Sequence, residues 1–205
     1  VRLDRQEQGC VAGDGDVLAD ILRTDAHRHR SLPAVTEHGS AGKALARQHQ
    51  GAGGAMQQTA KNGGLIMMHA ENGLAIDIVA AQTFEAGTTD PIGHAIARKA
   101  VFEGEATNRV IRLAEAAGVP VYIVHLSSKE ALVEVRAARD RGTKAFAETC
   151  PQYLFLSIDD MGSGFEGAKF VCSPPLRPKG DWDELWNGLI KDDLQAVATD
   201  HCPFD

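Results

Sequence analysis

Short apolar runs alternate with amphipathic stretches along the chain from residue 55 onward. Four of these runs have the length of buried parallel strands, and we expect strands at 64–69, 121–125, 144–148 and 194–200. Apolar residues recur at helical spacing between the runs, which predicts helices over 103–117, 129–141 and 181–190. This order of elements predicts an α/β fold, in which repeated strand–helix units surround a parallel sheet.

Single residues mark the ends of two of these helices. Gly118 and Gly142 each follow the last residue of a helical pattern, where a left-handed backbone commonly ends a helix. Ser128 precedes the second helix, and its hydroxyl is suited to accept a hydrogen bond from the first turn. Between the last two strands we expect a loop with prolines, followed by a helix that starts at Asp181.

The first 54 residues differ from the rest of the chain. They contain no Phe, Trp, Tyr or Met and show neither helical nor strand periodicity, so they have little to bury. We therefore divide the chain into an irregular segment, 1–54, and a regular part, 55–205. The abrupt change near residue 54 favours an opening stretch that is non-native or read in a shifted frame; a diverged N-terminal region is the alternative.

Length, charge and cysteine spacing narrow the classes of protein. The chain has 205 residues, whereas a complete eight-stranded α/β barrel typically has about 250. It has no apolar run of membrane-spanning length and no leader pattern, so we expect a soluble, cytoplasmic protein. A net charge of −7 without a basic cluster argues against nucleic acid as a partner. The four cysteines form no CxxC pair, which favours reduced thiols.

Three of the expected strands end in a residue able to bind a metal ion: His69, His125 and Asp200. The carboxyl ends of barrel strands meet at one face, so residues far apart in sequence can share one site there. One histidine after an apolar strand is more often a hydrogen-bonded structural residue than a ligand. Three such residues at equivalent positions are much less readily explained by chance, and imidazoles with a carboxylate are suitable ligands for zinc.

Five local motifs occur in the order seen in one family of enzymes: His69-Ala70-Glu71-Asn72-Gly73, His125-Leu126-Ser127-Ser128, Glu148-Thr149-Cys150-Pro151-Gln152-Tyr153-Leu154, Cys172-Ser173-Pro174-Pro175-Leu176-Arg177 and Ala198-Thr199-Asp200-His201-Cys202-Pro203-Phe204. In these motifs about three quarters of the chain resembles the dihydropyrimidinase and D-hydantoinase family of cyclic amidohydrolases. The resemblance implies part of a (β/α)8 TIM-type barrel of the metal-dependent hydrolase superfamily.

The resemblance also implies a chemistry and a set of roles. His69 and His125 would hold one Zn²⁺ of a binuclear pair, and Asp200 would bind the other and transfer a proton. Ser173 would contact the substrate, largely through its backbone. The implied reaction is hydrolysis of the cyclic amide bond of dihydropyrimidines or hydantoins by metal-activated water, as in pyrimidine catabolism. The partners would be a small cyclic amide or ureide and, in a full-length relative, three further copies in a homotetramer.

Some parts of the family pattern are missing. His27-Arg28-His29 imitates the HxH pair of the first strand, but only 39 residues separate His29 from His69, too few for three intervening strand–helix units of about 30 residues each. Lys43 does not follow a convincing strand, so the bridging carboxylated lysine is not found. An open half-barrel also exposes strand edges. We therefore expect the isolated chain to fold poorly and to have impaired activity.

Two other functions remain open. An allantoinase or another cyclic amidohydrolase would have the same fold and chemistry. The Gln152-Tyr153 pair argues against these relatives, which usually have a histidine in that stretch. A non-catalytic dihydropyrimidinase-like protein would keep the barrel for assembly. Such proteins usually lose metal ligands, whereas His69, His125 and Asp200 are intact.

Overall fold

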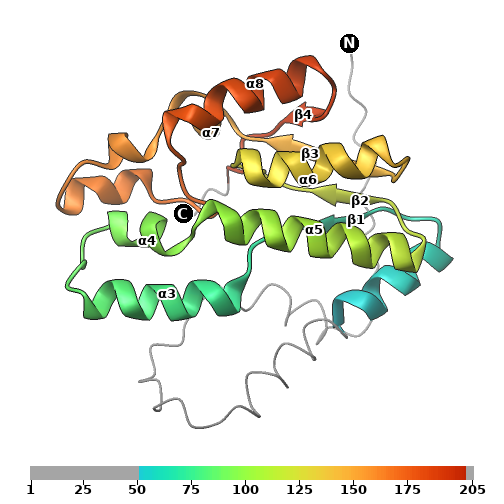
Figure 1. Cartoon of the computed structure of the whole chain (residues 1–205), viewed down its shortest axis with the longest axis horizontal. Coiled ribbons are helices and arrows are strands. Elements are labelled where there is room, and N and C mark those ends of the chain that lie inside the picture. The colour runs from blue at the N-terminus through green and yellow to red at the C-terminus, as the bar shows by residue number, and fades with distance from the viewer. Residues whose placement is uncertain (1–50, 202–205) are drawn as a thin grey trace, which may run out of the picture. The chain divides into compact units, whose positions relative to one another are not determined.

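A computed structural model describes residues 51–201 of the chain (Figure 1). Nearly all of the described residues belong to one compact unit, Gly53–Asp205. Residues 51–61 are helical, so the last four residues of the segment predicted to be irregular lie in a helix. The rest of that segment, with His27, His29 and Lys43, lies outside the described residues, and the boundary at residue 54 stays a prediction.

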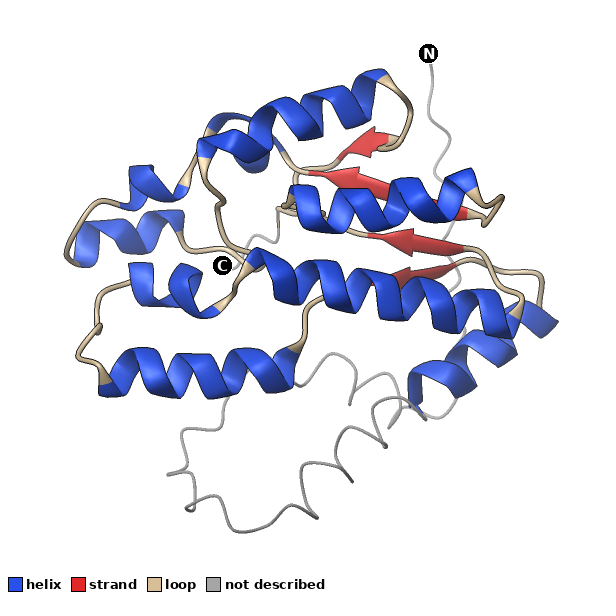
Figure 2. Ribbon diagram, in the orientation of Figure 1, coloured by secondary structure: helices blue, strands red, loops and turns tan. Residues whose placement is uncertain are grey.

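Strands and helices alternate through the described part (Figure 2). The strands are β1 (Ile66–Met68), β2 (Val121–Ile123), β3 (Ala145–Thr149) and β4 (Ala196–Val197). The α-helices are α3 (Gly73–Glu85), α4 (Ile92–Ala97), α5 (Ala100–Ala117), α6 (Lys129–Asp140), α7 (Pro151–Phe155) and α8 (Trp182–Ile190). Short 3-10 helices span Ile158–Met161, Phe165–Phe170 and Lys179–Asp181.

The four strands form one parallel sheet in the order β1-β2-β3-β4. Met68 of β1 pairs with Ile123 of β2, and Ile123 pairs in turn with Ala147 of β3. Parallel neighbours require a crossover between consecutive strands, and the helices supply it. All four strands therefore end at the same edge of the sheet, which brings together the residues that follow them.

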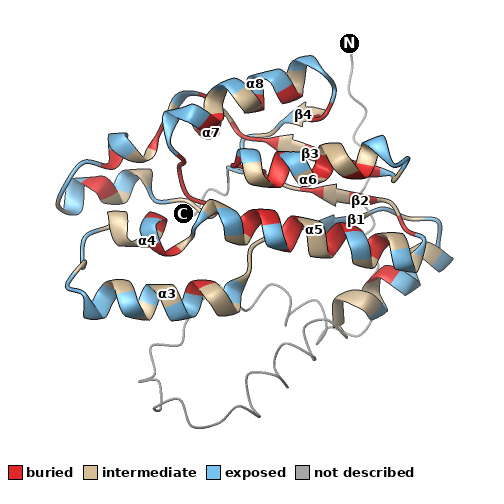
Figure 3. Cartoon of the chain, in the orientation of Figure 1, coloured by how far each residue is buried: buried red, intermediate tan, exposed pale blue. Residues whose placement is uncertain are grey.

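One face of the sheet is buried by helices, with α5 and α6 in front of the strands in Figures 1 and 3. Val121 and Ile123 of β2 alternate with the half-buried Tyr122, so the helix-covered face of this strand holds its fully buried residues. On the other side, Met67 of β1 is 58% exposed. The core of the described unit thus lies between the sheet and its helices.

The strands and helices that the sequence predicted occur in the predicted order, but α3, α4 and α7 were not predicted. Gly118 and Gly142 adopt left-handed conformations with φ of 70° and 83°, and the Ser128 hydroxyl accepts a hydrogen bond from the Ala131 backbone, as predicted. The strands are shorter than predicted. Between β1 and β2 the chain forms α3 and α4 before α5, and the expected loop after β3 begins with α7.

We expect Gly104→Ala to destabilise the chain by about 1–3 kcal/mol, because α5 and α6 approach closely at Gly104. A Cβ atom there would lie 3.0 Å from the Glu130 Cβ and 3.2 Å from the Glu130 carbonyl carbon. Gly54→Ala is the matched control, since nothing lies within 4 Å of a Cβ in that exposed helical position. It should stabilise by about 0.5–1 kcal/mol through helix propensity. Urea unfolding of both variants measures the two changes, and equal changes would contradict the close approach.

Candidate metal and substrate site

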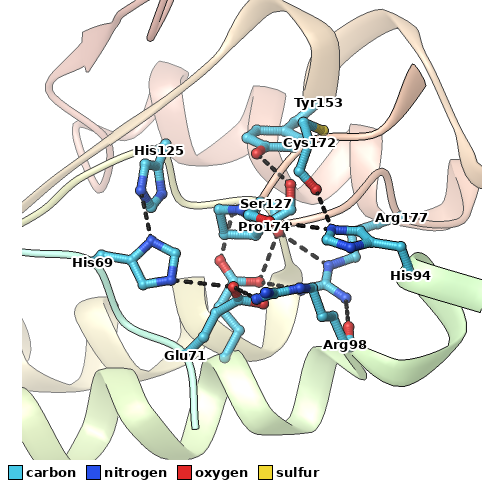
Figure 4. A network of polar contacts seen from close by, with 12 residues as sticks. His69, Glu71, His94, Arg98, His125, Ser127, Tyr153, Cys172, Pro174 and Arg177 are labelled. Atoms are coloured by element: carbon cyan, nitrogen blue, oxygen red, sulfur yellow. Dashed lines mark hydrogen bonds and ion pairs between the residues drawn. The ribbon is translucent and has the colours of Figure 1, made fainter. Parts of the chain in front are cut away.

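His69 and His125 meet at the carboxyl edge of the sheet (Figure 4). They follow β1 and β2, whose last residues Met68 and Ile123 are paired in register. Nδ1 of His69 lies 2.9 Å from Nε2 of His125, and the two rings meet edge-on with centroids 4.7 Å apart. The sheet therefore brings together two of the three residues predicted to bind metal.

The orientation of His69 is fixed by Glu71. Nε2 of His69 lies 3.1 Å from a carboxylate oxygen of Glu71, and it donates its proton to that oxygen. The same carboxylate forms an ion pair with Arg98, which follows α4. Burial alone would raise the pKa of Glu71, but the hydrogen bond from His69 and the charge of Arg98 outweigh it and lower the pKa. Glu71 is thus ionised, and Nδ1 of His69 presents its lone pair toward His125.

His125 is 8% exposed, and its backbone has a φ of 42°, which is rare for a residue other than glycine. Burial, and then the neighbouring His69, lower its pKa and favour the neutral ring. Its Nδ1 atom is buried without a hydrogen-bond partner among the described residues. A neutral imidazole whose Nε2 faces another ring nitrogen is chemically suited to bind a metal ion.

The histidine pair fits two ligands of a metal centre. Nδ1 of His69 and Nε2 of His125 face each other across 2.9 Å, and one ion could bind both nitrogens in place of the hydrogen bond once the proton of His125 is on its Nδ1 atom. The carboxylate that receives the other proton of His69 is a partner common to metal-binding histidines. Within residues 51–201 no group of three or more His, Cys, Asp or Glu side chains is arranged to hold a metal ion. Within residues 51–201, the arrangement of side chains therefore supplies these two histidines as metal ligands and no third ligand beside them.

Asp200 lies after β4 at the same edge of the sheet, and it is exposed. Its charge acts on His125, where it opposes the lowering of the pKa, and on Cys150. Asp200 has a φ of 48°, so two of the three non-glycine residues with positive φ in the described part follow strands at this edge. Backbone outliers of this kind cluster at functional sites. A metal-binding or proton-transfer role for Asp200 stays a prediction.

Ser173 lies on the loop 172–177, next to Cys172 and Pro174, and contacts His94 of α4. Nε2 of His94 lies 3.1 Å from the Ser173 hydroxyl and 3.0 Å from the Cys172 carbonyl oxygen. The Tyr153 hydroxyl donates a 2.6 Å hydrogen bond to the Pro174 carbonyl. The peptide bond between Ser173 and Pro174 is cis. The substrate role predicted for Ser173 is untested by this geometry, but the loop has defined partners.

A buried ion pair joins this loop to the end of β2. Arg177 and Glu103 are 5% and 2% exposed, and their side chains lie 2.9 Å apart. Both also bind Ser127, two residues after His125: Ser127 donates from its hydroxyl and its backbone to Glu103, and its hydroxyl accepts from Arg177. Arg177 also donates to the backbone carbonyl of Arg98. This network fixes the loop relative to the strand that carries His125.

The sequence indicated some of these residues and missed others. Glu71 and Arg177 lie within the family motifs, but no role was predicted for them or for His94. Glu103 shares the buried face of α5 with Ala106, Thr107 and Val110 at helical spacing. A carboxylate on an apolar helix face is a signal from which a buried charged partner could have been predicted.

Two cysteines, Cys150 and Cys172, lie near the site. Burial raises the pKa of Cys150 to about 12, and it also raises the pKa of Cys172. Neither thiol is thus activated as a nucleophile. Cys150 is buried and Cys172 is half-buried, whereas Cys202 lies outside the described part.

Comparison with known proteins gives the family. A D-hydantoinase from Streptomyces coelicolor is 60% identical over 151 residues, which make up 73% of this chain and 32% of the relative. The chain belongs to the D-hydantoinase and dihydropyrimidinase family. A D-hydantoinase from Geobacillus stearothermophilus is 46% identical over 144 residues. The chain thus spans about a third of the length of these two hydantoinases. No family model matches it.

Solved structures confirm the partial barrel fold. A dihydropyrimidinase from Brevibacillus agri superimposes with a TM-score of 0.74 at 43% identity, over 76% of this chain and 34% of the other. A dihydroorotase from Campylobacter jejuni, with a TM-score of 0.52 at 12% identity, shows the fold alone. Membership of this amidohydrolase family supports a metal requirement for the site. In residues 51–201 there is no helix long and apolar enough to cross a membrane.

Proposed function

We propose that the chain carries part of the active site of a hydrolase that opens cyclic amides, acting on dihydropyrimidines or 5-substituted hydantoins. The observation that carries the proposal is the pair of facing histidine nitrogens at the carboxyl edge of the sheet, 2.9 Å apart. They belong to a chain that is 60% identical to a D-hydantoinase over 151 residues. This activity is the one to which both the family and the residues point.

In this proposal the metal is Zn²⁺, and His69 and His125 hold it through Nδ1 and Nε2. When bound, zinc polarises the substrate carbonyl and makes a water nucleophilic at neutral pH. Glu71 keeps the proton of His69 on Nε2, which leaves the Nδ1 lone pair for the metal. A neutral His125 is favoured by its burial. Asp200 would bind the second metal, and no described residue corresponds to the bridging lysine of the family.

Asp200 and Ser173 have the remaining roles. The exposed carboxylate of Asp200 would accept the proton released by the attacking water and return it to the leaving nitrogen. Ser173 would contact the cyclic amide, largely through its backbone. Loop 172–177 and the end of β2 are fixed to each other by the Glu103–Arg177 pair, so the contact would keep its place relative to His125.

We expect Glu71→Gln to weaken Zn²⁺ binding by about 10–100-fold, because an amide holds the proton on Nε2 of His69 less strongly than a carboxylate. Competition with a coloured chelator measures the affinity. Glu166→Gln is the matched control, since it makes the same change in charge on a side chain that is 89% exposed. Equal zinc affinities in the two variants would contradict the orienting role of Glu71.

Ring opening by the chain loaded with Zn²⁺ tests the function. Dihydrouracil, a 5-substituted hydantoin and allantoin are incubated with the chain and with Asp200→Asn, and the opened products are separated by chromatography. We expect metal-dependent turnover of the first two, lost in Asp200→Asn and slow relative to a complete hydantoinase. Preference for allantoin would favour an allantoinase. Zinc binding without turnover of any ring would favour a non-catalytic relative.

The cellular location, the oligomeric state and the absence of nucleic-acid partners stay predictions. A cytoplasmic location, a homotetramer of the full-length relative and the absence of nucleic acid among the partners rest on the sequence and the resemblance. Size-exclusion chromatography with light scattering would test the assembly directly.

A further inference from the structure

We propose that His94 is a positioning residue that holds Ser173 in place for a cyclic amide. The inference rests on the proposed function for the identity of the ligand. Its structural part is independent of that function: His94 fixes the Cys172–Ser173 end of the loop 172–177. This role explains a half-buried histidine that is not one of the metal ligands.

The hydrogen bonds of His94 show that its Nε2 atom carries a proton. The Cys172 carbonyl oxygen, 3.0 Å from Nε2, can only accept, so Nε2 must carry the proton to bind it. The Ser173 hydroxyl oxygen, 3.1 Å from the same atom, then accepts as well. Both groups are satisfied by the Nε2–H tautomer, whereas an unprotonated Nε2 would lose the contact with Cys172. The Nε2–H group of His94 therefore bridges two consecutive residues of the loop.

The two ends of the loop are held differently. Residues 174–177 are buried, and Tyr153 and Arg177 attach them to α7, α5 and Ser127 in the loop after β2. Ser173 is half-buried, and its hydrogen bond to His94 is its single one among the described residues. Its backbone N–H and C=O therefore make no hydrogen bond within residues 51–201. A donor and an acceptor at one residue match the edge of a cyclic amide, which presents a C=O beside an N–H.

The segment that carries His94 also connects this loop to His69, one of the two histidines of the facing pair. His94 belongs to α4, and Arg98 follows one turn later. Arg98 binds Glu71, which orients His69, while its backbone carbonyl accepts from Arg177. The segment 94–98 thus contacts the loop 172–177 through His94 and contacts Glu71 through Arg98. A ligand held at Ser173 would therefore be placed relative to His69 by this segment.

Nuclear magnetic resonance of the 205-residue chain tests the structural part. We expect the Ser173 amide to have an order parameter of about 0.85 in the unchanged chain and below about 0.6 in His94→Ala. His94→Gln should restore the higher value, because its side-chain amide also donates. Ile96→Ala, on the same helix but outside this network, is the control and should leave Ser173 unchanged. An equally ordered Ser173 amide in His94→Ala, or a disordered one in the unchanged chain, would overturn the proposal.

Titration with hydantoin or dihydrouracil, followed at the same amide with Zn²⁺ bound, tests the ligand. We expect His94→Ala to weaken binding about tenfold without changing zinc affinity, and His94→Gln to bind almost normally. Equal ligand affinity in His94→Ala would overturn the role in substrate placement. If no cyclic amide binds the unchanged chain while Ser173 still loses order in His94→Ala, the proposed function fails and the positioning of the loop stands.

Discussion

Glu103→Ala is expected to lower the free energy of unfolding by about 3–5 kcal/mol, because it leaves Arg177 buried without its counter-charge. Glu103 is 2% exposed and accepts hydrogen bonds from Arg177 and from the backbone and hydroxyl of Ser127. A domain of this kind is stable by about 5–15 kcal/mol in total, so the change removes a large share of it. Urea unfolding followed by circular dichroism measures the difference.

Glu105→Ala is the matched control, because Glu105 lies two residues further along α5 and its side chain is 45% exposed. Its ion pair with Arg109 should contribute less than about 1 kcal/mol. Combining Glu103→Leu with Arg177→Met should recover much of the lost stability, since no buried charge is then left unpaired. A similar cost for the Glu103 and Glu105 variants would contradict the buried pair. A cooperative transition of the unchanged chain would contradict the expectation that it folds poorly.

His125→Ala is expected to abolish measurable Zn²⁺ binding at micromolar protein concentration. The variant keeps only Nδ1 of His69 from the facing pair, and a single imidazole does not hold zinc against water as two do. Isothermal titration of the metal-free chain with Zn²⁺ measures the affinity and the number of ions bound.

His94→Ala removes a histidine from the same region but not from the pair, and it should keep its zinc. In the unchanged chain the His94 ring forms hydrogen bonds with Cys172 and Ser173, whereas the His125 ring faces His69. Loss of zinc in both variants, or in neither, would show that the ion does not depend on the facing nitrogens.

The fold could be predicted from local pattern where the pattern is regular. Apolar runs of strand length gave all four strands, and Gly118, Gly142 and Ser128 marked helix ends because backbone conformation and capping are local properties. The α3 helix was missed for a physical reason: its apolar residues surround the helix instead of forming one stripe, as in Leu74, Ile76, Ile78 and Val79. The α7 helix is five residues long and begins at a proline, which resembles a turn in sequence.

The site was predictable only in part. His69 and His125 follow parallel strands, and parallel strands end at one edge, so their proximity follows from the order of elements. The partners of these residues depend on which helices pack together. No local pattern could show that α4 brings His94 to Ser173, or that Arg177 would meet Glu103 from 74 residues away. Such pairings depend on tertiary structure.

X-ray absorption at the zinc edge tests the central claim, that His69 and His125 hold the metal of a cyclic amidohydrolase. For the chain loaded with one equivalent of Zn²⁺, two imidazole nitrogens at about 2.0–2.1 Å are predicted, and this signal should be lost in His125→Ala. A shell dominated by sulfur at about 2.3 Å, or a spectrum that is the same in His125→Ala, would contradict the account.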